Sequence, residues 1–242
     1  MKQIIILTGI IVLFLGTNVD AKNINKTIGI ESISQINLKL TIGRITIYES
    51  NSKKIKISGS ITGNSSQGVK VKKIGNIINI KQKIGFFPVK FGETEIFIEI
   101  PATFNKDITV RQSTGKLIIQ KINVNSLNIK SMAASVDVDD IVFKDLILKA
   151  GSGWSNIDLK RKCGNMTIGS SVGKVKLKVD KIGGNIKFNG GTMGGTLVIP
   201  QNAPVNITNL GNKNVQIAAS TFDEGNYNIF IKPGVGKIRV IN

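Results

Sequence analysis

The sequence has no histidine, one cysteine and few aromatic residues, and each scarcity excludes a class of function. Without histidine there is neither a Ser-His-Asp nor a Cys-His catalytic arrangement, and no imidazole ligand for a metal. One cysteine forms no internal disulfide and no zinc knuckle. Aromatic residues make up 5% of the chain, which gives no sign of base-stacking platforms for nucleic acid. We therefore predict no catalytic residue, no metal site, no cofactor and no specific nucleic-acid partner.

Acidic residues are also scarce, because 33 Lys and Arg stand against 15 Asp and Glu and give a net charge of +18. Hydrophobic residues reach 41%, enough for a folded core. The 26 glycines beside 5 prolines predict many turns between short elements. The composition thus indicates a folded, strongly basic protein.

The N-terminus has the pattern of a secretory signal. A basic start at Lys2 precedes an apolar run over residues 4–15 and a small-residue end at Ala21. We expect cleavage after residues 1–21, with an uncleaved membrane anchor as the alternative, although the run is short for a span of roughly 20 residues. No later segment is apolar enough to span a bilayer. The sequence predicts export to the periplasm, the cell surface or the medium of a bacterium.

The rest of the chain, residues 22–242, has the pattern of β-strands. Runs such as Ile45-Thr46-Ile47 and residues 95–100 alternate apolar and polar side chains, which places the apolar ones on one face of a strand. β-Branched residues dominate these runs. Outside the signal no segment has a helical period, so we predict an all-β domain.

From residue 117 onward the strand patterns recur about every 20 residues. Two interleaved series give each repeat two short strands, and Gly/Ser turns follow the second strand. A fixed period of this length is typical of solenoids. One series begins at Leu117, Val136, Ile157, Val175 and Leu197, and the other at Leu127, Leu146, Met166 and Ile186.

We therefore predict a β-solenoid-like stack in which each coil has about 20 residues and two short strands. An antiparallel β-meander or sandwich is the alternative. One continuous domain is expected, with a less regular strand-rich part over 22–100, regular repeats over 101–200 and a C-terminal cap over 201–242. The prediction requires that four residues lie side by side on neighbouring strands: Leu127, Leu146, Met166 and Ile186.

Two features resemble the bacterial putative-adhesin family of exported β-strand-repeat domains. One is the junction at Pro101 that leads into residues 108–119, and the other is the step from Gly into alternating apolar residues at 173–177 and 234–240. The resemblance covers roughly residues 36–240. It implies a β-solenoid of the cell envelope or surface, described as adhesive, and it supplies no catalytic residues.

Basic residues cluster between positions 160 and 187 with little acidic compensation. In a solenoid, Lys160 and Lys178 would stack in one outward column with Lys176 beside them, and an anionic partner would relieve their repulsion. An anionic envelope polymer or another envelope protein is the candidate partner, and a merely solvated face is the alternative. The predicted anionic-ligand surface comprises Lys160, Arg161, Lys162, Lys174, Lys176, Lys178 and Lys187.

Three aromatic residues are candidate contacts. Trp154 lies in a Gly/Ser turn, where its ring could stack on a sugar, with local packing as the alternative. Phe86 and Phe87 lie in a Gly-Phe-Phe-Pro turn. They could form a tip that contacts a membrane or a partner, or fold back over an open end of the core.

The acidic residues and the cysteine have simpler interpretations. Asp137 and Asp139 alternate on one strand, and Asp158 is expected near Asp137 in the next repeat. We interpret them as a polar outer column that offsets nearby lysines, with calcium binding or acid/base catalysis as alternatives. Cys163 falls where Ile182 stands in another repeat, so it is expected to be a small core residue.

These features together favour a non-enzymatic module of the envelope or cell surface, adhesin-like, with a basic face toward anionic polymers or partner proteins. A polysaccharide-acting enzyme built on a β-helix is one alternative. A component that signals envelope stress through protein contacts is another.

Overall fold

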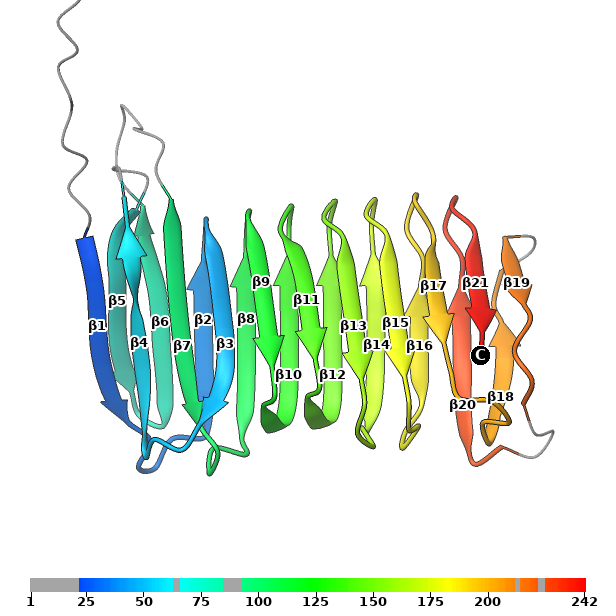
Figure 1. Cartoon of the computed structure of the whole chain (residues 1–242), viewed down its shortest axis with the longest axis horizontal. Coiled ribbons are helices and arrows are strands. Elements are labelled where there is room, and N and C mark those ends of the chain that lie inside the picture. Colours follow the sequence, from blue (N-terminus) through cyan, green and yellow to red (C-terminus); the bar gives the residue numbers. More distant parts are fainter. Residues whose placement is uncertain (1–21, 63–65, 85–92, 212–213, 222–224) are drawn as a thin grey trace, which may run out of the picture.

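The computed structural model describes residues 22–62, 66–84, 93–211, 214–221 and 225–242, and all regular elements in these ranges are β-strands (Figure 1). They form an eleven-stranded and a ten-stranded sheet. The larger sheet contains β1 (Lys22–Gly29), β3 (Arg44–Ser50), β4 (Lys54–Ile61), β7 (Thr94–Pro101), β9 (Lys116–Gln120), β11 (Ser135–Asp139), β13 (Ser155–Leu159), β15 (Val175–Val179), β17 (Gly195–Val198), β19 (Val215–Ile217) and β21 (Ile238–Ile241). The smaller sheet contains β2 (Gln35–Leu40), β5 (Ser66–Ile74), β6 (Ile77–Ile84), β8 (Asp107–Gln112), β10 (Asn123–Ser131), β12 (Val142–Ala150), β14 (Asn165–Ser170), β16 (Ile186–Asn189), β18 (Val205–Asn209) and β20 (Tyr227–Lys232).

The central part of the chain, from β8 to β17, is a regular parallel stack. Successive strands alternate between the two sheets, so each coil contributes one strand to each, and every pairing between neighbouring coils is parallel. This confirms the predicted solenoid-like stack with two short strands per coil. The antiparallel meander is wrong for this region, because a meander would pair consecutive strands of the chain with each other.

The core lies between the two sheets and consists of aliphatic rows that run along the stack. Leu127, Leu146, Met166 and Ile186 are register partners in succession, as the sequence predicts, and all four are buried. The alternation of strands explains this, since one face of each strand carries the apolar residues and points inward.

In the larger sheet the register differs by two residues from the predicted series. Val136 lies opposite Ser155 rather than Ile157, and Val175 lies opposite Gly195 rather than Leu197. These inward positions hold small residues, which an apolar pattern does not mark. At Gly195 the small residue is required, because a Cβ would come within 2.9 Å of the Phe188 ring from the other sheet.

The two ends are built differently, because the chain runs outward and then returns. At the N-terminal end β6 and β7 lie between the β2–β3 coil and the outer strands β5 and β4, with antiparallel pairs β5–β6 and β4–β7. At the C-terminal end β20 and β21 lie between β16–β17 and the outermost β18–β19, with all pairs parallel. At both ends some strands pair across about 42 residues, as β2 does with β6 and β16 with β20, which is why the 20-residue period is lost there (Figure 1).

Candidate functional site

The seven basic residues predicted to share one face occupy three places. Lys174, Lys176 and Lys178 lie on or just before β15, on the larger sheet. Lys187 lies on β16 in the smaller sheet. The group formed by Lys160, Arg161 and Lys162 lies in the connection between β13 and β14. The single basic face is therefore divided, because the coil turns between these positions.

The expected column of Lys160 above Lys178 is wrong. Lys178 is the register partner of Asp158, and its Nζ lies 3.8 Å from Asp158 Oδ1 and 3.2 Å from Asp180 Oδ1. Lys160 Nζ instead lies 3.0 Å from Asp139 Oδ1, and this hydrogen bond raises the pKa of Lys160. Opposite charges thus alternate where like charges were predicted.

The carboxylates of this region act mainly as partners of cations. Arg161 Nε donates to Asp140 Oδ1 at 2.8 Å, and Lys116 Nζ lies 2.7 Å from Asp137 Oδ2. Asp158 lies beside Asp139 in the register, not beside Asp137 as expected. No group of three or more Cys, Asp or Glu within the described ranges could hold a metal ion.

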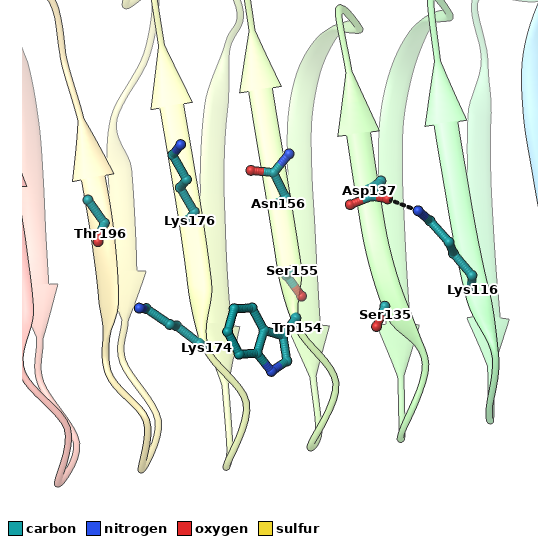
Figure 2. A pocket seen from close by; sticks show the side chains of 9 residues that line it. All are labelled: Lys116, Ser135, Asp137, Trp154, Ser155, Asn156, Lys174, Lys176 and Thr196. Atoms are coloured by element: carbon teal, nitrogen blue, oxygen red, sulfur yellow. Dashed lines mark ion pairs between the residues drawn. The ribbon is translucent and has the colours of Figure 1, made fainter.

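An open depression of about 500 Å³ lies on the outer face of the larger sheet, across β9 to β17 (Figure 2). Trp154 stands at one side of it and is 61% exposed. Lys174 Nζ lies 5.8 Å from the centroid of the Trp154 ring, within the range of a cation–π interaction. Successive strands complete the lining with Lys116, Ser135, Asp137, Ser155, Asn156, Lys176 and Thr196.

Close packing of the turns holds Trp154 at the surface. A Cβ on Gly153 would lie 2.0 Å from the carbonyl oxygen of Ala134, and one on Gly173 would lie 1.9 Å from that of Gly153. Glycine is therefore needed where the backbones of neighbouring coils touch. The N–H of Val136 also donates to the carbonyl of Trp154 at 2.8 Å, so the backbone is fixed while the indole remains exposed.

The arrangement combines an exposed indole, unpaired cations and neutral polar groups. The flat indole can cover the apolar face of a sugar ring. Lys176 forms no ion pair with any described residue, so its ammonium group is available to an acidic substituent. Asn156 and Thr196, the register partners of Lys176 on the adjacent strands, offer an amide and a hydroxyl to sugar hydroxyls.

Sequence reasoning found Trp154, Lys174 and Lys176 but missed Asn156 and Thr196. The signal was present, because these positions follow the 20-residue interval that places residues side by side. Neutral polar residues carry no chemical signature of their own, and only their register with a lysine makes them notable.

The remaining candidates fall outside the site. Phe86 and Phe87 lie outside the described residues. Cys163 is buried in the core and bridges to Ile182 as predicted. Its Sγ lies 3.2 Å from the carbonyl oxygen of Ile141, and burial raises the pKa of the thiol to about 11, which makes it unreactive at neutral pH.

Comparison with known proteins gives a family and a group of similar structures. The Toastrack DUF4097 family model matches residues 33–220. No curated protein sequence matches the chain. Within the described residues no helix is long and apolar enough to cross a membrane.

Three solved structures are similar at low identity. A putative cell adhesion protein from Clostridium sporogenes is 15% identical with a TM-score of 0.44, and the match covers 92% of this chain and 98% of that one. A putative lipid binding protein from Parabacteroides distasonis is 14% identical with a TM-score of 0.49, covering 93% and 98%. A putative adhesin from Bacteroides fragilis is 14% identical with a TM-score of 0.40, covering 90% and 97%. None of the three is named as an enzyme.

Proposed function

The chain belongs to the Toastrack DUF4097 family, and from its own surface we propose that it is an exported, non-enzymatic, adhesin-like module of the bacterial envelope that binds acidic sugars. The observation that carries the proposal is the exposed Trp154 with Lys174 beside its ring. An exposed indole next to cations suits a sugar that bears a carboxylate or phosphate.

The rigid sheet supports this function because it fixes the spacing of the contacts. Trp154, Lys174 and Lys176 are attached to adjacent strands of a hydrogen-bonded sheet, so their relative positions change little when a ligand binds. A preformed site loses less conformational entropy on binding than a flexible one. The ion pair of Lys116 with Asp137 at the other end limits the number of free cations, which favours a short acidic segment over a dense polyanion.

Trp154 is the only tryptophan in the chain, so its fluorescence reports on the site directly. We expect a uronic acid disaccharide to shift or quench the indole emission, and the matched neutral disaccharide to bind several-fold more weakly. Replacement of both Lys174 and Lys176 by Gln should weaken acidic-sugar binding by about tenfold. The matched control, Lys106→Gln with Lys181→Gln, has the same charge change at exposed residues outside the depression.

Trp154→Ala should abolish measurable binding in calorimetry, while the melting temperature stays near that of the parent because the ring is exposed. Binding that leaves the emission unchanged and survives Trp154→Ala would remove this site from the proposal.

Export is tested independently of the ligand. Mass measurement of the protein recovered from its native cells should show the chain without residues 1–21, in the envelope fraction. Recovery of the full-length chain from the cytosol would refute the proposed location. Release from the envelope by concentrated salt would indicate that electrostatic contact retains the protein there.

A further inference from the structure

The smaller sheet places a basic residue at the same position on six adjacent strands. These strands are, in spatial order, β5, β6, β2, β8, β10 and β12 (Figure 1). Each basic residue is the register partner of the next, and all six are exposed. We call this row the cation ladder, and it consists of Lys70, Lys81, Lys39, Arg111, Lys130 and Lys149.

No member of the ladder forms an ion pair with a described residue. The acidic residues on these six strands are Asp107 and Asp145, which stand four residues before Arg111 and Lys149. Four residues of extended chain span about 13 Å, too far for an ion pair. Those two carboxylates instead accept hydrogen bonds from Asn125 and Asn165. The ladder therefore has uncompensated charge.

The spacing of the ladder follows from the sheet itself. Adjacent strands lie about 4.8 Å apart, so six strands place their cations along a line of about 24 Å. Like charges directly opposite each other destabilise a sheet. A linear polyanion laid along the stack axis would relieve this repulsion over the whole line.

A row of neutral polar residues runs parallel to the ladder on β6, β2, β8 and β10, two residues before the ladder residue of each strand. Lys39, Lys81 and Arg111 border an open depression of about 470 Å³, and Asn37, Asn79, Thr109 and Asn128 also line it. Asn37 Nδ2 donates to Asn79 Oδ1 at 3.2 Å. Asn128 Oδ1 is buried and has no hydrogen-bond partner among the described residues. A buried acceptor of this kind is costly unless a ligand or water donates to it.

From the ladder and the neighbouring polar row we propose that the smaller sheet binds a linear acidic polysaccharide whose chain lies across the strands. Its carboxylates contact the ladder, and its hydroxyls contact the amides and the hydroxyl of the polar row. The strand spacing is comparable with the advance of such a chain per sugar unit. None of the six strands exposes an aromatic side chain, so the surface lacks the stacking platforms typical of single-stranded nucleic-acid binding.

The test uses galacturonate oligomers of increasing length with the chain from residue 22 onward, in the Trp154→Ala background. This background removes the indole on which the proposed site of the opposite sheet depends, so failure here and failure of the proposed function are distinguishable. We expect calorimetric affinity to rise with length until about six sugar units and then level off, because six cations are available. Affinity should fall steeply as salt is added.

Two variants with equal net charge identify the surface. Replacing Lys39, Arg111 and Lys130 by Gln should weaken hexamer binding by about tenfold or more. Replacing Lys54, Lys106 and Lys181 by Gln, all exposed and outside the ladder, should change it by less than about twofold. Thermal melting of both variants checks that the fold is retained, which their exposed positions favour.

Three results would overturn the inference. One is an equal loss in both variants, which would mean that net charge alone attracts the polymer. Another is affinity independent of oligomer length, which would mean that no extended contact forms. The third is tighter binding of single-stranded DNA with the same number of charges, which would assign the ladder to a different polyanion.

Discussion

The two sheets share one core but present opposite arrangements of charge. The strands of the larger sheet contain nine Lys or Arg and six Asp or Glu, whereas those of the smaller sheet contain twelve and two. All ion pairs between described residues involve the larger sheet or the turns that follow its strands. On the smaller sheet the six cations of the ladder stand in one row, and none of these six forms an ion pair with a described residue.

Register, more than composition, decides what a surface of this fold can bind. A coil places each outward residue beside its equivalents in the neighbouring coils. Where the equivalents have opposite charges, as with Asp158 and Lys178, they neutralise each other. Where they have the same charge, as with Lys130 and Lys149, they form a continuous strip of positive electrostatic potential. Net charge alone does not distinguish the two outcomes.

The largest expected effect is on the free energy of unfolding, when a core residue between the two sheets is truncated. Leu146 is buried in the aliphatic row of the smaller sheet. Leu146→Ala should lower the free energy of unfolding by about 3 kcal/mol, because it removes buried methyl groups and leaves a cavity. Chemical denaturation measures this, with Lys144→Ala on the exposed surface of β12 as the control. A loss below about 1 kcal/mol would mean that the two sheets are not tightly packed at this row.

The next effect concerns Cys163, which lies in the connection between the sheets. Burial raises the pKa of this thiol from its ordinary value of 9.0 to about 11 in the folded chain. Because the unfolded chain loses the proton first, the free energy of unfolding should fall as pH rises from 9 to 11, by about 2 kcal/mol. Denaturation of the parent and of Cys163→Ala across this range isolates the effect from the lysines. An identical pH dependence in both would contradict burial of the thiol.

Much of the central stack could be predicted from the sequence, because there the coils follow one another in order. The aliphatic row from Leu127 to Ile186 was identified from spacing alone, and so was the core position of Cys163. The inward positions of Ser155 and Gly195 were missed because small residues break an apolar pattern without breaking the fold.

The candidate surfaces were harder to predict for a related reason. Lys39 and Lys81 are 42 residues apart in the chain and are neighbours only because β6 returns to pair with β2. No local pattern marks such a return. The prediction of a single basic face was wrong for the opposite reason: residues that are close in sequence lie far apart on the fold. Lys178 and Lys187, for example, lie on different sheets.

A charge reversal in the ladder should make the smaller sheet resemble the larger one. Glutamate in Arg111→Glu would lie in register with Lys39 and Lys130. Two cross-strand ion pairs would replace two repulsions, so the free energy of unfolding should rise by about 0.5–1 kcal/mol at low salt. Lys106→Glu, outside the sheet, is the control with the same charge change. A decrease in stability would show that the ladder stores no repulsion.

The smallest expected effect is on sugar affinity, when a carboxylate is removed from the larger sheet. Asp137→Asn removes the carboxylate that lies 2.7 Å from Lys116 Nζ and leaves that ammonium group free beside the Trp154 depression. The affinity for a uronic acid disaccharide should rise by no more than about twofold, since an exposed pair contributes only a few tenths of a kcal/mol. Indole fluorescence measures this, and Asp180→Asn, outside the depression, is the control. Equal gains in both variants would mean that long-range charge, and not the freed Lys116, attracts the sugar.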